Sequence, residues 1–304
     1  MNKTRLWRSW FISMCTLVFS VCCVSTTLAK ISELEKKALL DLYYSTNGAE
    51  WNRTWNLSKP VTTWYGVGIE KDHIVSLYLF NNNLSGNLPS SIGNLEHLKV
   101  LNLAFNAIEG NIPKSMAHLD RLEELRLGKN RITGSISPII GALENLEVLE
   151  IFDNNLSGPI PAELKDLKML KWMILSQNNL TGKLPEELGQ LYALERLELG
   201  DNNLAGPIPN SLGKLKKLQV LILSENQLTG KIPPGLLSLA RLKLVQLQNN
   251  NFDKHQAYAI VKRKTDLNSF NYQDKDPRFR ALRYKLVKSG QWFDMAETDF
   301  EEFN

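Results

Sequence analysis

Large aliphatic residues recur along the chain in a pattern that repeats every 24 positions. In the first unit, Leu77 and Leu79 alternate with Ser76 and Tyr78, which is the period-two pattern of a strand with one buried face. An asparagine follows each such pair of large apolar residues, and a glycine usually lies four positions beyond it. The asparagines, which keep this interval without a slip, are Asn82, Asn106, Asn130, Asn154, Asn178, Asn202, Asn226 and Asn250.

A fixed period of this length predicts a solenoid of stacked coils. One strand of each coil should pair in parallel with the next, about 4.7–4.9 Å away. The turn after each strand would be buried, and buried peptide groups need hydrogen-bond partners. Because an asparagine side chain both donates and accepts, the stacked asparagines should satisfy the turns of neighbouring coils. The pattern lapses after Asn250, where Lys254 stands in place of glycine, so we expect seven full coils and a partial eighth.

The unit reads LxxLxLxxNxLxGxIPxxLGxL and resembles the plant-type subclass of the leucine-rich repeat family over about 180 residues. The resemblance implies an α/β solenoid, a right-handed superhelix with a parallel β-sheet on its concave side. It also implies recognition, since plant-type members commonly bind ligands on the inner or lateral face.

The repeats divide the chain into four parts. We expect a signal peptide over residues 1–29, an N-terminal cap over 30–73, the solenoid over 74–252, and a C-terminal cap with a charged tail over 253–304. Caps are expected because an open solenoid exposes its core at both ends. Lys254 to Lys288 carries ten basic and three acidic residues. A solvated tail is the favoured interpretation, ahead of a partner-docking helix or an envelope-attachment segment.

The N-terminal segment, from Met1 to Ala29, has the layout of a secretory signal peptide. A basic start is followed by a mostly apolar run from Trp10 to Val24 and by small residues ending at Ala29. The run is shorter than the ~20 residues that span a bilayer, so cleavage near Ala29 is favoured over a retained anchor, and a lipoprotein is a smaller possibility. The mature chain would then be secreted, periplasmic or on the cell surface.

Removal of this segment would change the cysteine content and the net charge of the chain. The segment contains all three cysteines, so the mature chain would have no disulfide, thiol nucleophile or cysteine metal site. It also contains three of the 36 basic residues and none of the 32 acidic ones, which leaves a net charge of +1. The basic isoelectric point is therefore no sign of nucleic-acid binding.

Residues 30–73 suit a helical cap. Ser32 and Glu35 have the spacing of a capping box, and Asn47-Gly48 should end the helix. The expected buried stripe is Ile31, Leu34, Ala38 and Leu42.

Three tryptophans follow this helix in close succession. Trp51, Trp55 and Trp64 could form a sugar-binding platform, but covering the open end of the repeat core is favoured. The order of these residues, ending in Trp64-Tyr65-Gly66-Val67, is similar to the caps of plant receptor-like kinases and polygalacturonase-inhibiting proteins. Those caps carry cysteines where Thr62 and Ile69 stand here, so this cap looks more like those of bacterial secreted or surface leucine-rich repeat proteins.

No catalytic motif stands out. The four histidines lack the spacing of HExxH, and there is no GxSxG or GxxxxGK[ST]. We therefore expect no enzyme activity, no metal and no cofactor. A carboxylate pair on neighbouring coils could hydrolyse glycosides, but nothing selects one pair.

The positions that the repeat leaves free should line the concave face. Strand alternation points the residues six, four and two places before each asparagine to that face. Large apolar groups rimmed by charge are typical of protein or glycan contacts. The candidate binding residues are Tyr78, Phe80, Glu124, Arg126, Glu150, Phe152, Trp172, Ile174, Arg196 and Glu198.

These features predict a non-catalytic recognition protein that binds a protein or an oligosaccharide, and no nucleic acid. An inhibitor of a polysaccharide-degrading hydrolase is the alternative, and a glycan-acting hydrolase is a weaker one. No segment beyond Ala29 is apolar enough to suggest a membrane span.

Overall fold

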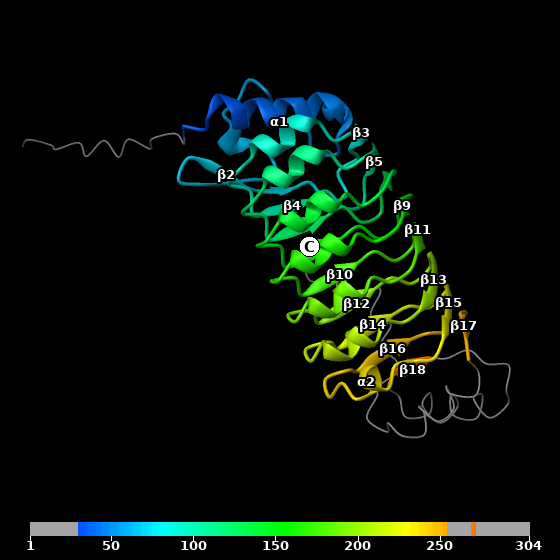
Figure 1. Cartoon of the computed structure of the whole chain (residues 1–304). Coiled ribbons are helices and arrows are strands. Elements are labelled where there is room, and N and C mark those ends of the chain that lie inside the picture. Colours follow the sequence, from blue (N-terminus) through cyan, green and yellow to red (C-terminus); the bar gives the residue numbers. More distant parts are fainter. Residues whose placement is uncertain (1–29, 254–268, 272–304) are drawn as a thin grey trace, which may run out of the picture.

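The computed structural model describes residues 30–253 and 269–271, and it is a stack of coils that follow one another in chain order (Figure 1). The expected α/β solenoid is confirmed. The expected signal peptide and nearly all of the C-terminal tail lie outside the described residues.

A ten-stranded sheet runs along the whole stack. Its first two strands, β1 (Val67–Glu70) and β2 (His73–Tyr78), form an antiparallel hairpin, and each later strand pairs in parallel with its neighbours. From β2 to β16 each residue lies opposite its equivalent in the next repeat, as in Ser76 opposite Val100. The later strands are β4 (Val100–Asn102), β6 (Glu124–Arg126), β8 (Val148–Glu150), β10 (Trp172–Ile174), β12 (Arg196–Glu198), β14 (Val220–Ile222), β16 (Leu244–Gln246) and β18 (Ser269–Asn271).

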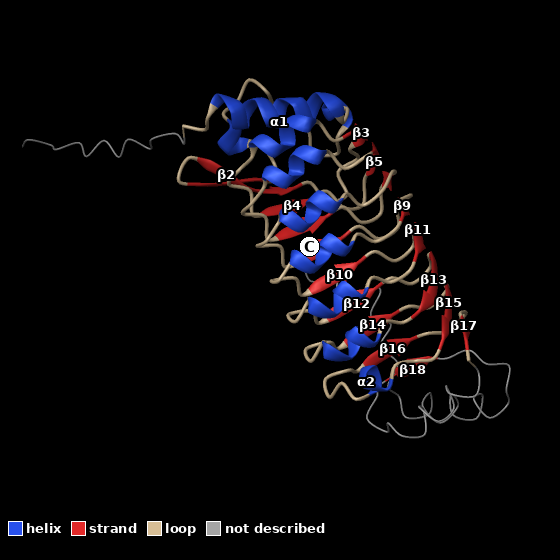
Figure 2. Ribbon diagram, viewed as in Figure 1, coloured by secondary structure: helices blue, strands red, loops and turns tan. Residues whose placement is uncertain are grey.

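After its strand in the ten-stranded sheet, each coil continues into a short lateral strand. A helical turn follows, across the leucine core from the ten-stranded sheet (Figure 2). The lateral strands form two small parallel sheets. One contains β3 (Ser85–Asn87), β5 (Ala107–Gly110) and β7 (Arg131–Ile132); the other contains β9 (Ser157–Gly158), β11 (Asn179–Gly182), β13 (Asn203–Pro207), β15 (Gln227–Gly230) and β17 (Asn251–Phe252). The helical turns are η3 (Ser90–Asn94), η4 (Lys114–His118), η5 (Pro138–Ala142), η6 (Ala162–Asp166), η7 (Glu186–Gln190), η8 (Asn210–Lys214) and α2 (Pro234–Leu237).

The repeat leucines fill the space between the sheet and the helical turns. Leu77, Leu79, Leu95 and Leu98 of the first coil are fully buried, and the equivalent positions of later coils are buried too. A single coil could not bury these side chains alone, so each coil depends on its neighbours for its core.

The asparagine ladder works as the sequence predicts. Asn154 Oδ1 accepts a hydrogen bond from the Ile132 backbone N–H at 2.9 Å. Its Nδ2 group donates to the carbonyls of Leu127 at 3.0 Å and Phe152 at 3.0 Å. One side chain thus joins backbone groups of two successive coils, and the other ladder positions from Asn106 to Asn250 repeat the arrangement.

The cap begins with α1 (Glu33–Ser45), which has the expected capping box between Ser32 and Glu35. Asn47 has a φ of 53° just beyond the helix, where Asn47-Gly48 was expected to end it, and η1 (Gly48–Glu50) follows. One expected core position is wrong: Leu34 is 64% exposed, because the buried face of α1 is made of Glu35, Ala38, Leu39 and Leu42.

The tryptophans of the cap cover the end of the core. Trp51, Trp55 and Trp64 are each 3–4% exposed, which rules out the sugar platform. The Trp55 and Trp64 rings stack with centroids 4.8 Å apart, and the Trp55 Nε1–H donates to the Tyr65 carbonyl at 2.8 Å. Near them lies η2 (Val61–Thr63). The first ladder residue joins this cap to the solenoid, since Asn82 Oδ1 accepts from the Arg53 N–H at 2.7 Å.

The far end of the sheet extends beyond the last asparagine. β18 pairs in parallel with β16, Leu244 lying opposite Ser269, and adds a strand after the expected partial eighth coil. Within residues 30–253 and 269–271, no helix is long and apolar enough to cross a bilayer.

Candidate functional site

The ten-stranded sheet presents most of the expected residues on the concave face, defined here as its side away from the leucine core. Tyr78 is 46% and Phe80 39% exposed. Glu124, Arg126, Phe152, Trp172, Ile174 and Arg196 are partly buried. Glu150 and Glu198 differ from the expectation of open rim charges, because they are only 6% and 8% exposed.

Three phenylalanines form a continuous aromatic band across the first four coils. The Phe80 and Phe105 ring centroids are 4.9 Å apart, and those of Phe105 and Phe152 are 6.1 Å apart in an edge-on arrangement. The Phe152 ring lies over Gly128, where an added Cβ would come within 2.3 Å of it. A glycine in the intervening coil therefore makes room for Phe152 to reach Phe105.

Phe105 is the residue that sequence reasoning missed. It lies one place before Asn106, outside the three columns assigned to the concave face. Its φ is +60°, and the residue before every other ladder asparagine also has a positive φ. The other seven residues at this position are Asn81, Lys129, Asp153, Gln177, Asp201, Glu225 and Asn249. A bulky aromatic is uncommon in this conformation. A phenylalanine among seven polar residues was the signal that could have revealed it.

Arg126 holds a compact charged group beside this band, which we call the Arg126 cluster: Glu124, Arg126, Glu150 and Trp172. Arg126 Nε contacts Glu124 Oε2 at 3.0 Å, and Nη1 contacts Glu150 Oε2 at 2.7 Å. The guanidinium also lies 5.7 Å from the centre of the Trp172 ring, within the range of a cation–π contact. Further along the sheet, Arg196 pairs with Glu198 in the same way.

Two aromatic residues of the expected concave face, Phe152 and Trp172, lie in different parts of that face. Trp172 lies opposite Val148 in the sheet, four residues before Phe152. That offset places the two aromatic residues roughly 13 Å apart along the strand direction. Phe152 therefore belongs to the aromatic band, and Trp172 to the Arg126 cluster.

Burial raises the pKa values of two side chains on the concave face. It raises the pKa of the Glu150 carboxyl above its ordinary value of 4.5, and the neighbouring Arg126 opposes this shift only in part. Burial, followed by the negative charge of Glu124, raises the pKa of the Tyr78 hydroxyl. Of these two groups, Glu150 is the one that contacts Arg126 directly.

A raised pKa makes the contribution of Glu150 to stability dependent on pH. The folded chain keeps its Glu150 proton at a pH where the unfolded chain has lost it, so the stabilisation is complete below about 4.5 and is lost as pH rises through the folded pKa. We expect the free energy of unfolding of the wild type, minus that of Glu150→Gln, to fall as pH rises from 4 to 7. Urea titrations of both proteins at several pH values measure this difference, and a rise would contradict it.

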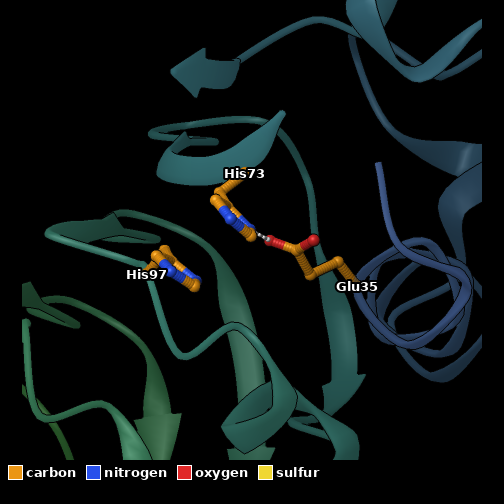
Figure 3. Close-up of side chains that lie close together, drawn as sticks. All are labelled: Glu35, His73 and His97. Carbon is orange, nitrogen blue, oxygen red and sulfur yellow. Dashed lines mark ion pairs between the residues drawn. The ribbon is translucent and has the colours of Figure 1, made fainter. Parts of the chain in front are cut away.

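Three described side chains elsewhere could hold a metal ion together. Glu35, His73 and His97 place their ligand atoms within 4.8 Å of one another, where the cap meets the first coil (Figure 3). They lie outside the aromatic band and the Arg126 cluster.

The geometry defines a stacked-repeat protein with an aromatic and charged inner face. Leucine-rich repeat family models match residues 72–132, 120–166, 169–191, 193–215 and 217–239. The chain belongs to the leucine-rich repeat family, in its plant-type subclass.

Solved structures agree with this assignment. The ectodomain of the Arabidopsis receptor kinase HAESA, in complex with an N-terminally extended IDA peptide hormone, is 32% identical with a TM-score of 0.63, over 72% of this chain and 37% of that one. A plant ice-binding protein is 25% identical with a TM-score of 0.69, over 81% and 79%. A leucine-rich repeat protein of Leptospira interrogans is 32% identical with a TM-score of 0.55, over 63% and 48%.

The share of the matched structure that this chain covers differs between the plant receptors and the ice-binding protein. The chain spans only 28–37% of the plant receptors that it matches, but most of the ice-binding protein.

Proposed function

We propose that this chain is a non-catalytic recognition protein, secreted or displayed at a cell surface, that binds an extended segment of a protein partner across its concave face. The observation that carries the proposal is the aromatic band of Phe80, Phe105 and Phe152 beside the Arg126 cluster. The similarity to a receptor ectodomain in complex with a peptide hormone supports it.

The shape of the surface favours a peptide-like ligand. The aromatic band runs across the strands and therefore offers a row of apolar contacts rather than one closed pocket. Aromatic residues and arginine are the side chains that most often dominate binding energy at protein interfaces. An oligosaccharide remains the other ligand class for this surface, since rings such as Tyr78 and Phe80 are exposed.

A substitution can separate binding from folding at Phe105. We expect Phe105→Asn to weaken ligand binding by more than ~2 kcal/mol, because it removes the central ring of the band. Stability should be unchanged or higher, because asparagine tolerates a positive φ and occupies the same position at Asn81 and Asn249. The affinity is measured by calorimetry and the stability by thermal unfolding.

The matched control for this variant is Tyr192→Ala, which removes a 59% exposed aromatic that lies outside the strands. Equal affinity losses in the two variants would show that the aromatic band is not the binding surface.

The ligand class is tested by selecting linear peptides from a phage-displayed library on the purified chain, with a glycan array in parallel. The proposal expects enriched peptides whose binding is lost in Phe105→Asn. Binding to glycans and to no peptide would contradict the proposal and indicate an oligosaccharide ligand. Inhibition of a polysaccharide-degrading enzyme at equimolar dose, from a panel of such enzymes, would favour the inhibitor alternative.

A second candidate, ice binding, is supported by the lateral sheet from β9 to β17. The residue after each ladder asparagine is exposed there and carries an amide: Asn155, Asn179, Asn203, Gln227 and Asn251. Two places further on lie the hydroxyls of Ser157, Thr181 and Thr229, which are also exposed, and Ala205 interrupts this series between Thr181 and Thr229. Parallel strands repeat such groups at about 4.8 Å, and a regular polar array of this kind is suited to ordered water.

The chain also covers 79% of the ice-binding protein named above. An ice recrystallisation assay separates this candidate from the first. Inhibition that Thr181→Lys abolishes and Phe105→Asn leaves intact would establish it, and normal ice growth would eliminate it.

A further inference from the structure

Three side chains from three parts of the chain meet where the cap joins the solenoid (Figure 3). Glu35 comes from α1, His73 begins β2, and His97 precedes β4. His73 Nδ1 lies 3.5 Å from Glu35 Oε1. The His73 and His97 rings are stacked, with centroids 3.5 Å apart and planes 8° apart.

The repeat itself brings the two histidines together. They are separated by one full repeat, so they occupy the same position in successive coils and lie side by side as their strands pair. Local motif spacing cannot show this, because the pairing crosses a whole coil. The interval between the two histidines, equal to that between the ladder asparagines, was the signal in the sequence.

Glu35 is held in place as a ligand would be. Its Oε2 accepts from the Ser32 hydroxyl at 2.7 Å, and its Oε1 accepts from the Ile74 N–H at 3.0 Å. The side chain is only 5% exposed. Oε1 keeps a second lone pair on the side of His73, and hydrogen bonds that orient a carboxylate in this way are typical of metal ligands.

The distance between Glu35 and His73 fits a metal better than a hydrogen bond. At 3.5 Å, Nδ1 and Oε1 are within ion-pair distance (Figure 3) but are not hydrogen-bonded, and the buried Nδ1 has no hydrogen-bond partner. Two ligand atoms that each lie about 2.0–2.1 Å from a tetrahedral ion are themselves ~3.4 Å apart. The pair therefore already has the spacing of two ligands on one ion.

We propose that Glu35, His73 and His97 bind a divalent transition-metal ion of the zinc class. Two imidazoles and one carboxylate are a donor set that zinc accepts, with a water molecule in the fourth position. Binding requires the His97 ring to rotate out of the stack, because an ion must lie near the plane of each imidazole that binds it. His97 is only partly buried, which leaves room for this rotation.

The bound ion would join the cap to the first two coils. α1 supplies one ligand and the successive strands β2 and β4 position the other two, so the ion would bind the folded arrangement and not the unfolded chain. Metal binding of this kind adds directly to the stability of the folded state.

Zinc titration of the full-length chain tests the site, with Cys15, Cys22 and Cys23 replaced by serine because thiolates also bind zinc. Calorimetry against a competing chelator should show one high-affinity ion, and zinc should raise the unfolding temperature. His97→Ala and Glu35→Gln should each lower the affinity at least ~100-fold, since even an outer-shell change costs about 10–100-fold. Glu35→Gln keeps the capping box, because glutamine can also fill it.

The control is His118→Ala, which removes an exposed histidine of η4 and should leave the affinity unchanged. The proposal is overturned if zinc fails to bind, or if the His97 and His118 variants have the same zinc affinity.

Discussion

Replacing Asn154 by alanine should lower the free energy of unfolding by about 3–5 kcal/mol. The substitution leaves the Ile132 N–H without a partner, which costs about 1–3 kcal/mol. The carbonyls of Leu127 and Phe152 keep the Asn130 amide and the Lys129 N–H, but each loses its hydrogen bond to Asn154, at about 0.5–1.5 kcal/mol each. Because the ladder joins neighbouring coils, the loss should fall on the contact between the third and fourth repeats.

Urea unfolding followed by circular dichroism measures this effect. Asn155→Ala is the matched control, because Asn155 is the next residue and is exposed, and its substitution should change stability by no more than ~0.5 kcal/mol. If the two alanine variants were equally stable, the ladder would not be what holds the coils together.

The second large effect is expected at Arg126. Arg126→Ala removes the cation that balances Glu150, whose side chain is only 8% exposed. Leaving a buried charge unpaired costs about 3–5 kcal/mol, and we expect ~3 kcal/mol because Arg126 itself is 24% exposed.

A double-mutant cycle isolates this interaction. Adding Glu150→Gln to Arg126→Ala removes the unpaired charge and should restore most of the lost stability. A double variant no more stable than Arg126→Ala alone would show that the loss comes from packing of the arginine chain instead.

The regular parts of the fold could be predicted because each repeat position has the same structural role in every coil. Leu77, Asn82 and Gly86 each recur with the same role, so one interpretation of one unit places residues in all of them. The register between Ser76 and Val100 follows directly from the period. The tryptophan cover of the cap was also predictable, since an open core needs large apolar side chains.

The site was harder to predict because it depends on departures from the repeat. Phe105 lies at a position that strand alternation does not point to the concave face, and its contacts with Phe80 and Phe152 depend on backbone angles of the turn. Glu150 was expected as an open charge, but its side chain is only 8% exposed and is paired with Arg126. Such contacts form between side chains of different coils once the coils have stacked. The residue pattern within one coil therefore cannot predict them.

The most direct test of recognition on the concave face is hydroxyl-radical footprinting of the chain with and without a peptide selected from the displayed library. Oxidation of each aromatic side chain reports its exposure to solvent. The account predicts that the peptide protects Phe80, Phe105, Phe152 and Trp172 and leaves Tyr44 and Tyr192 as reactive as before. Protection of Tyr44 or Tyr192, with the concave aromatics unchanged, would contradict it.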